Sequence, residues 1–149
     1  DYANVLDFIN VATDYNNADY AANIEELVDV DEWMRFFAIH HAVGNWDSLG
    51  YQNQQNTYSY KPRNGRWELI PWDANIVLGN SNSDGPSNLP LFATSDPTLT
   101  KWFAAASPLR RRYLVALHQL VNGPMQVSLL SPMLDAKYAA FQEHGVTAG

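Results

Sequence analysis

Residues Gly44–Gly79, with the sequence GNWDSLGYQNQQNTYSYKPRNGRWELIPWDANIVLG, decide how the rest of this chain is organised. The stretch contains two aspartates, Asp47 and Asp73, and each directly follows a tryptophan. Between them, Thr57–Lys61 alternates as a strand does, and Arg66–Trp72 returns as a second strand rich in aromatic and β-branched residues. The turn-forming sequence PRNG joins the two strands, so the hairpin brings Asp73 back toward Asp47. We therefore predict a single site that contains both carboxylates.

Composition limits what this site does. The chain has 149 residues, of which 46% are hydrophobic and 13% aromatic, which predicts one globular domain with a substantial core. A net charge of −7 argues against nucleic-acid binding, and the lack of cysteine excludes disulfides and thiolate metal sites. No apolar run approaches the roughly 20 residues of a membrane helix, and no signal peptide is visible. Because the chain begins at Asp1 without a methionine, we expect it to be a piece of a longer protein.

Three helices are predicted before the hairpin. The first has an apolar face formed by Tyr2, Val5, Leu6, Ile9 and Ala12. A short helix is predicted at Ala18–Leu27, and a third at Val30–Val43, where Asp29 and Glu32 have capping-box spacing. The third helix is apolar on nearly all sides, which predicts a buried helix, and Gly44 is suited to end it. Asp47 then follows on a loop held by the core, where catalytic residues often lie.

The residues after the hairpin predict one loop and three more helices. The segment Asn80–Asn88 is polar and turn-rich. Helices are predicted from Asp96 to Ala105, from Ser107 to Val121 and from Ser131 to His144. Their predicted inner faces consist of Tyr113, Leu114, Leu117, Leu120 and Val121 in one helix, and Leu134, Tyr138 and Phe141 in the last. The predicted fold class is α+β, mainly α, with one β-hairpin between the two candidate site aspartates.

Each candidate residue also has a purely structural interpretation. Asp47 and Asp73 are typical cap or turn residues, and loop asparagines such as Asn53 and Asn56 usually serve turns. His40 and His41 lie on a buried helix without a further ligand at metal spacing, which favours histidines hydrogen-bonded in the core over a zinc site. The basic run Arg110–Arg112 is typical of a solvated helix face, and a partner-binding role is the less favoured alternative.

Three motifs in this order resemble the spore-coat protein H (CotH) kinase-like family. They are Gly44-Asn45-Trp46-Asp47, Asn56-Thr57-Tyr58-Ser59-Tyr60 and Pro71-Trp72-Asp73-Ala74-Asn75. The downstream sequences LFATSDPTLTKWFAA and PLRRRYLVALHQLVNGP also resemble the C-terminal helices of that family, so the likeness covers most of the chain. The resemblance implies a protein-kinase-like C-lobe in an atypical kinase, and it implies a secreted or envelope-associated bacterial protein.

The resemblance also implies a role for each site residue. Asp47 would be the catalytic base that accepts the proton of a Ser or Thr hydroxyl on a protein substrate, with ATP as the phosphate donor. Asp73 would be the main metal ligand and Asn56 a second one, with Mg²⁺ or Mn²⁺ as the ion. The family usually has an acidic residue where this chain has Asn75, which we include among the metal ligands. Because the stretch before Asn56 is longer than usual, Asn53 is its rival.

A kinase also needs a lysine that holds the nucleotide phosphates. The chain has only Lys61, Lys101 and Lys137, and all three follow the predicted catalytic loop. By resemblance, the nucleotide lobe and its lysine lie upstream of Asp1. We therefore expect the full-length protein to be the kinase and this chain alone to be inactive.

Two other classes of function remain open from the sequence. One is a non-catalytic binding or scaffold module of a secreted protein. The other is a glycoside hydrolase in which Asp47 and Asp73 form an acid–base pair and Trp46 and Trp72 are sugar platforms.

Overall fold

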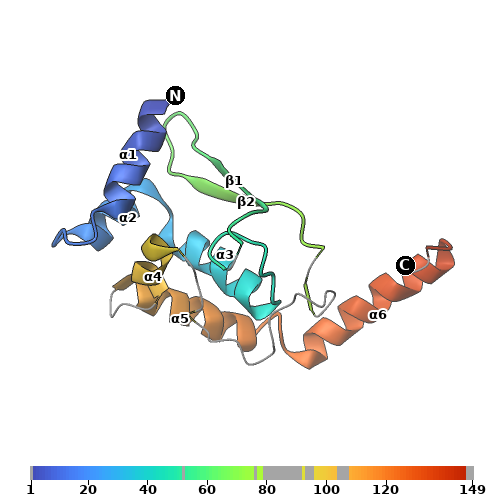
Figure 1. The fold of residues 1–149 in the computed structure, drawn as a ribbon. Helices are drawn as coiled ribbons and strands as arrows, with labels where there is room; N and C mark the ends of the chain where they lie inside the picture. The colour runs from blue at the N-terminus through green and yellow to red at the C-terminus, as the bar shows by residue number, and fades with distance from the viewer. Residues whose placement is uncertain are drawn as a thin grey trace. The chain divides into compact units, whose positions relative to one another are not determined.

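The computed structural model describes residues 2–51, 53–75, 77–78, 92, 96–103 and 108–146. Its elements are, in chain order, α1 (Tyr2–Thr13), α2 (Tyr20–Leu27), α3 (Val30–Ala42), β1 (Thr57–Tyr60), β2 (Glu68–Pro71), α4 (Pro97–Phe103), α5 (Pro108–Val121) and α6 (Val127–Glu143) (Figure 1). Helices dominate the described residues, and the strands form a single antiparallel pair. The mainly helical α+β class is confirmed. The predicted loop Asn80–Asn88 lies outside the described residues, as do residues 104–107 after α4.

Two compact units make up the chain, Asp1–Leu117 and His118–Gly149. The first unit contains the hairpin, α1 to α4 and most of α5, and it carries every candidate site residue. The second unit contains the last residues of α5 and the whole of α6. No residue of α6 is buried.

Helix α3 is the element on which the candidate site is built, and both of its ends match the sequence prediction. At the start, the Asp29 carboxylate accepts a hydrogen bond from the Glu32 amide at 3.1 Å. At the end, Gly44 adopts a left-handed φ of 69°, and the Asn45 amide donates to the His40 carbonyl at 2.9 Å. This pattern closes the helix and turns the chain sharply toward Asp47.

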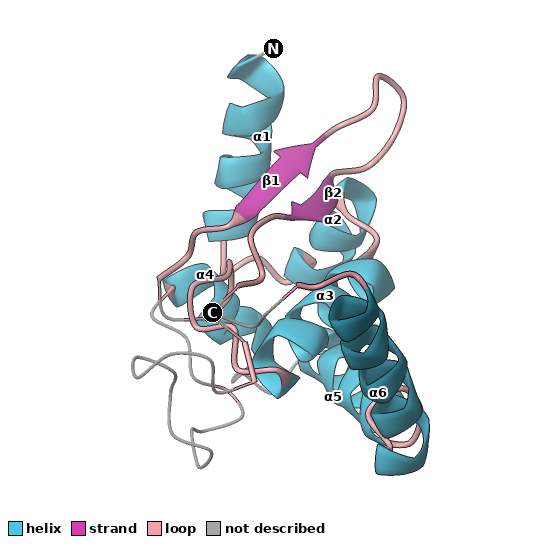
Figure 2. Ribbon diagram, turned by 90° about the vertical axis from the view of Figure 1, so that its right-hand side faces the viewer, coloured by secondary structure: helices cyan, strands magenta, loops and turns pink. Residues whose placement is uncertain are grey.

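The hairpin forms as predicted, with Thr57 opposite Pro71 and Tyr60 opposite Glu68. Its return strand is anchored at Trp67, just before β2. The Trp67 amide donates to the Leu27 carbonyl at 2.7 Å, and the Trp33 indole donates to the Trp67 carbonyl at 2.8 Å. Two hydrogen bonds therefore fix the hairpin to the junction between α2 and α3, above which the strands lie in Figure 2.

An aromatic cluster forms the centre of the first unit. The Trp33 ring packs against Phe37 with centroids 6.2 Å apart and against Trp102 of α4 at 5.6 Å. From α1, Phe8 contacts Trp33 at 5.8 Å and Trp67 at 5.7 Å. Helix α1 thus runs beside the hairpin (Figures 1 and 2). These large rings bury much of the apolar area that stabilises the unit.

Several predicted inner faces are wrong. Of the predicted face of α1, only Ala12 is buried, whereas Tyr2, Val5, Leu6 and Ile9 are exposed; the helix also packs through Phe8. The apolar residues Leu134, Tyr138 and Phe141 of α6 are also exposed, and α6 begins at Val127, before its predicted start. Amphipathic periodicity predicts which face a helix could bury, but burial also requires a partner surface.

The two long central helices differ less from expectation. In α5, Tyr113, Leu117 and Leu120 are buried as predicted, whereas Leu114 and Val121 are exposed. The predicted inner face of α5 was therefore too wide. Only a narrow stripe of the helix contacts its neighbours, and the residues on either side of that stripe remain in solvent. In α3, the apolar residues Ile39 and Ala42 are exposed and depart from the all-round prediction, for the same reason.

The basic run of α5 is largely solvated, as predicted, since Arg111 and Arg112 are exposed, but two of its side chains also make contacts. The Arg112 guanidinium donates to both oxygens of the Asp31 carboxylate, at 3.0 and 2.9 Å. The Arg110 guanidinium lies 4.7 Å from the centre of the Phe92 ring. These contacts link α5 to the start of α3 and to the segment that precedes α4.

Candidate functional site

The loop that carries Asp47 rests on buried polar residues. Asn45 and Ser48 are fully buried, and the Ser48 hydroxyl donates to the Asn45 carbonyl at 2.8 Å. The Asn53 amide donates to the Trp46 carbonyl at 3.0 Å, and the Gln55 amide donates to the Asp47 carbonyl at 3.1 Å. Residues 53–55 therefore fold back on residues 46 and 47, and the peptide groups on both sides of Asp47 are hydrogen-bonded.

Two asparagine side chains hold the carboxylate of Asp47. The Asn56 side-chain amide donates to Asp47 Oδ2 at 2.6 Å, and the Asn53 side-chain amide donates to Asp47 Oδ1. Each carboxylate oxygen thus accepts one amide hydrogen bond, which fixes the orientation of the group. Both of the asparagines considered from the sequence lie against Asp47.

Asn56 also connects Asp47 to the segment of Asp73. Its main-chain carbonyl accepts a hydrogen bond from the Trp72 amide at 2.9 Å, directly beside Asp73. Further along, the Leu78 amide donates to the Val43 carbonyl at 2.8 Å, at the end of α3. The hairpin therefore returns the Asp73 segment to the loop that carries Asp47, as the sequence predicts.

Asp73 itself has different surroundings from Asp47. Its φ is 46°, a left-handed conformation that it shares with Asn56, whose φ is 52°. Asp73 is exposed, and within the described part of the chain its carboxylate makes no hydrogen bond. Asn75 is also exposed, two residues further along. The roles of these residues in metal binding and catalysis stay predictions.

The two histidines are core residues, as the sequence favours. His41 Nε2 donates to the Gly50 carbonyl at 2.9 Å, which leaves Nδ1 to accept from the Tyr113 hydroxyl at 2.6 Å. This bond connects α3 and α5 beneath the Asp47 loop. Burial lowers the pKa of His41 below its usual range and raises the pKa of Tyr113. Both groups are therefore neutral near pH 7.

His40 supports the same loop from the preceding helix position. The Asn45 side-chain amide donates to His40 Nδ1 at 2.9 Å. Burial, together with the neighbouring His41, lowers the pKa of His40 to about 4. No spacing rule in the sequence indicated these contacts: Asn45 reaches His40 through the turn that ends α3, and Tyr113 reaches His41 through tertiary packing.

Two buried polar atoms next to Asp47 in the chain have no hydrogen-bond partner among the described residues. They are Asn45 Oδ1 and Trp46 Nε1. Trp46 is half-buried, whereas Trp72 is 59% exposed and packs edge-on against Tyr58. The two tryptophans therefore do not present the matched exposed rings that paired sugar platforms require.

The donor set around Asp47 and Asp73 consists of carboxylate and amide oxygens. Hard divalent cations such as Mg²⁺ and Mn²⁺ prefer these ligands, so the residues present fit such an ion. Within the described ranges, no three His, Cys, Asp or Glu side chains gather as a metal site. An ion held here would therefore depend on amide oxygens and on ligands from a substrate.

Comparison with known proteins identifies relatives of the chain. The family model described as CotH kinase protein matches residues 1–146. The protein named Invasin CotH2 of Rhizopus delemar is 29% identical over 85 residues. That match covers 56% of this chain and 14% of the Rhizopus protein. No solved structure gives a significant match. The named relative is fungal, so the comparison does not support the expected bacterial source.

Among the described residues, no helix is both long and apolar enough to cross a bilayer.

Proposed function

Because this chain belongs to the CotH kinase protein family, we propose that it is the carboxylate-bearing C-lobe of an atypical kinase. The full-length protein would transfer the γ-phosphate of ATP to Ser or Thr side chains of a protein substrate. The observation that carries this proposal is the dual role of Asn56. Its side chain bonds to Asp47 while its backbone bonds to Trp72, the residue before Asp73.

The arrangement suits the division of labour that phosphoryl transfer requires. Asp47, held by two amides, would accept the proton of the substrate hydroxyl as its oxygen attacks the phosphate. Asp73 and the carbonyl oxygen of the Asn56 side chain would hold a divalent ion, with Asn75 as a further ligand. When bound, Mg²⁺ or Mn²⁺ would neutralise charge on the phosphates. The hydrogen bond between Asn56 and Asp47 would keep base and ligand in register.

Of the two amides on Asp47, Asn56 is the better candidate ligand. Asn53 also bonds to Asp47, but its backbone amide is directed to Trp46, within the same loop. Only Asn56, of this pair, is bonded to the strand that leads into Asp73. A metal ligand that acts together with both aspartates has to lie close to both segments, and Asn56 is hydrogen-bonded to Asp47 and to Trp72, the residue before Asp73.

The lysine that holds the nucleotide would come from residues that precede Asp1. Lys61 lies 6.0 Å from the Trp67 ring and beyond the end of β1 that is distant from Asn56. Lys101 lies on α4, 5.5 Å from the Tyr15 ring. Neither contacts the loop of Asp47. By the family resemblance, and by the name of its fungal relative, the whole protein would act at the cell surface or after secretion.

The proposal is tested with full-length protein, radiolabelled ATP, Mn²⁺ or Mg²⁺ and a Ser- and Thr-bearing protein such as casein. We expect Asp47→Ala to reduce transfer at least 100-fold while nucleotide binding remains, because removal of a general base commonly costs about 10²–10⁴ in rate. We expect Asp73→Ala to abolish metal-dependent nucleotide binding as well. Asp135→Ala, a change on the exposed helix α6 of the second unit, is the control. Full activity in both site variants would refute the proposed roles.

A further inference from the structure

Two consecutive histidines of α3 hold the loop that carries Asp47 on both sides of that residue. Asn45, two residues before Asp47, donates from its side-chain amide to His40 Nδ1 at 2.9 Å. Gly50, three residues after Asp47, accepts from His41 Nε2 through its carbonyl at 2.9 Å. The last turn of α3 therefore bonds to both arms of the loop.

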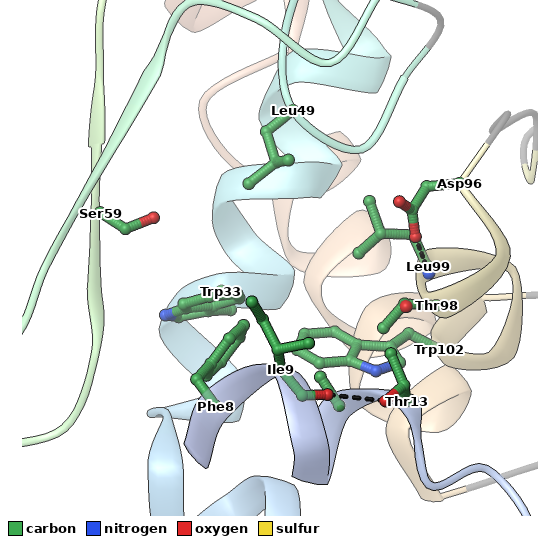
Figure 3. Close-up of a pocket in the computed structure, with 11 residues that line it drawn as sticks. Phe8, Ile9, Thr13, Trp33, Leu49, Ser59, Asp96, Thr98, Leu99 and Trp102 are labelled. Atoms are coloured by element: carbon green, nitrogen blue, oxygen red, sulfur yellow. Dashed lines mark hydrogen bonds between the residues drawn. The ribbon is translucent and has the colours of Figure 1, made fainter. Parts of the chain in front are cut away.

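The other contacts of the Gly50 arm are apolar. Gly50 lies against the buried ring of Phe37. Its neighbour Leu49 borders a cavity of about 260 Å³, at the top of Figure 3, so space is left on that side. Apolar contact is non-directional, so it supports the loop without orienting it. The hydrogen bond from His41 is the contact that fixes the direction of the Gly50 carbonyl.

The His41 ring is itself oriented by Tyr113 of α5. A carbonyl only accepts hydrogen bonds, so Nε2 carries the proton, and the neutral Nδ1 accepts from the Tyr113 hydroxyl at 2.6 Å. The Tyr113 side chain is fully buried. The residue before it, Arg112, donates to Asp31 at the start of α3. Tyr113 is thus a donor whose position is set by the packing of two helices.

The rest of the loop connects Gly50 to Asp47. Gly50 lies in a turn in which the Tyr51 amide donates to the Ser48 carbonyl at 3.2 Å. Ser48 also forms a β-bridge with Gln55, whose amide donates to the Asp47 carbonyl at 3.1 Å. A displacement of Gly50 is therefore passed to the backbone of Asp47.

We propose that His41, oriented by Tyr113, is a positioning residue for Asp47 and acts on it through Gly50. The proposal rests on the role of Asp47 as the base in the proposed function. A reacting group that is misplaced by about 1 Å can lose about 100-fold in rate. The nucleotide would be held elsewhere, by the ion at Asp73. Loss of the His41 hydrogen bonds should therefore lower kcat and leave the KM for ATP unchanged.

The first test is by NMR on the 149-residue chain and needs no activity. The Nε2 proton of His41 should exchange slowly with solvent, because a buried, hydrogen-bonded proton exchanges only when the structure opens locally. Tyr113→Phe should speed this exchange at least tenfold. It should also shift the side-chain amide signals of Asn53 and Asn56, the two donors to the carboxylate of Asp47.

Tyr51→Phe is the matched control for the NMR test. The Tyr51 ring is almost fully buried and lies 5.1 Å from the His41 ring, but its hydroxyl makes no hydrogen bond within the described residues. The same chemical change should therefore leave the exchange of the His41 proton as it is in the unmodified chain.

The second test is kinetic and uses the full-length protein with casein as acceptor. Tyr113→Phe and His41→Leu should each lower kcat at least about tenfold with an unchanged KM for ATP. His41→Gln, whose amide can donate to Gly50, should retain more of kcat than His41→Leu. Tyr20→Phe is the control for stability, since it removes a hydroxyl that donates to the Ala12 carbonyl at 2.8 Å, between α1 and α2. It should leave kcat unchanged, and circular dichroism confirms that each variant is folded.

Several results would overturn the positioning role. One is a Tyr113→Phe variant in which the signals of Asn53 and Asn56 stay in place. Another is a loss of kcat that Tyr20→Phe matches, or full transfer by both Tyr113→Phe and His41→Leu beside an active wild type. Absence of transfer by the wild-type protein would instead refute the proposed function, and the NMR test would then decide alone whether His41 holds the loop.

Discussion

Asp47 and Asp73 lie in segments that the same hairpin brings together, yet the fold holds them in opposite ways. Asp47 follows a buried helix, its backbone is bonded on both sides, and two asparagine amides orient its carboxylate. Asp73 follows an exposed strand in a left-handed conformation, and its carboxylate makes no hydrogen bond within the described residues. The protein thus completes one of the two environments by itself and leaves the other incomplete.

This difference matches the two proposed roles. A general base has to be positioned before the substrate arrives, because misplacement by a fraction of an ångström reduces the rate. A ligand for Mg²⁺ is completed by waters and by substrate phosphates, so it gains little from partners within the protein. The comparison predicts that disturbing the surroundings of Asp47 will destabilise the fold, whereas disturbing those of Asp73 will not.

The largest expected loss of stability comes from a substitution at Gly50, where the Asp47 loop packs against the buried ring of Phe37. A Cβ atom at this position would lie 2.6 Å from Cδ1 and 2.8 Å from Cε1 of the buried Phe37 ring, and its φ is 90°. Gly50→Ala should therefore reduce the free energy of unfolding by about 3 kcal/mol or more, through overpacking and backbone strain. Urea unfolding followed by circular dichroism measures this.

Gly44→Ala is the matched control. Gly44 has a φ of 69°, but a Cβ there would meet no atom within 4 Å. Its cost should be only that of a left-handed alanine, about 1 kcal/mol. Equal costs at the two glycines would mean that the contact with Phe37 does not hold the Asp47 loop in place.

The second largest effect concerns pH and the histidines beneath the loop. Burial lowers the pKa of His40 to about 4, and the pKa of His41 is lowered as well. Between pH 6.5 and 4 the unfolded chain binds protons that the folded chain does not, so stability is complete above pH 6.5 and falls toward pH 4. A tenfold change in proton affinity is worth about 1.4 kcal/mol, which gives about 3 kcal/mol for His40.

Urea unfolding at pH 4.5 and 7 measures this loss, and NMR of the histidine rings identifies the groups responsible. A variant with the exposed His118 and His144 both replaced by Gln should retain the same loss of stability. If the His40 ring takes up its proton near pH 6.5 in the folded protein, the support of the loop differs from the one described.

Much of the Asp47 environment could be predicted from sequence because its signals are local. Asp29 with Glu32 marked the start of α3, Gly44 marked its end, and PRNG marked the turn of the hairpin. Each of these patterns satisfies backbone groups within a few residues, so no tertiary partner has to be known. The hairpin then placed Asn56 beside Trp72 by register alone.

The rest depends on partners that no local pattern specifies. The predicted apolar face of α1 has the periodicity of a buried face, yet its residues Tyr2 and Leu6 are exposed because α1 packs through Ala12, at one end of that face, and through Phe8, outside it. The bond between His41 and Tyr113 joins residues 72 positions apart. Periodicity predicts that an element has an apolar face, but the choice of partner is a property of the whole fold.

A smaller effect on stability is expected from two substitutions that exchange an amide and a carboxylate, one beside Asp47 and one at Asp73. Asn56→Asp replaces an amide donor 2.6 Å from Asp47 Oδ2 with a carboxylate oxygen. The lost hydrogen bond and the repulsion between the carboxylates should cost about 1–2 kcal/mol at neutral pH. Asp73→Asn is equally small and also lies at positive φ, but it should change stability by less than about 0.5 kcal/mol. Thermal unfolding of both variants is the measurement, and a larger cost at Asp73 would reverse the comparison.

The smallest expected effect is the binding of ATP by this chain alone. The incomplete environment of Asp73 would have to recruit an ion without help from Lys61 and Lys101, which lie against Trp67 and Tyr15. The net charge of −7 also opposes the approach of a polyanion. We therefore expect a Kd weaker than roughly 1 mM, equivalent to about 4 kcal/mol of binding free energy. Isothermal titration of ATP with Mg²⁺ or Mn²⁺ into the 149-residue chain measures this, with Asp73→Asn as the control. Micromolar binding that Asp73→Asn abolishes would mean that these residues complete the nucleotide site without an upstream lobe, and that the two-lobe proposal is wrong.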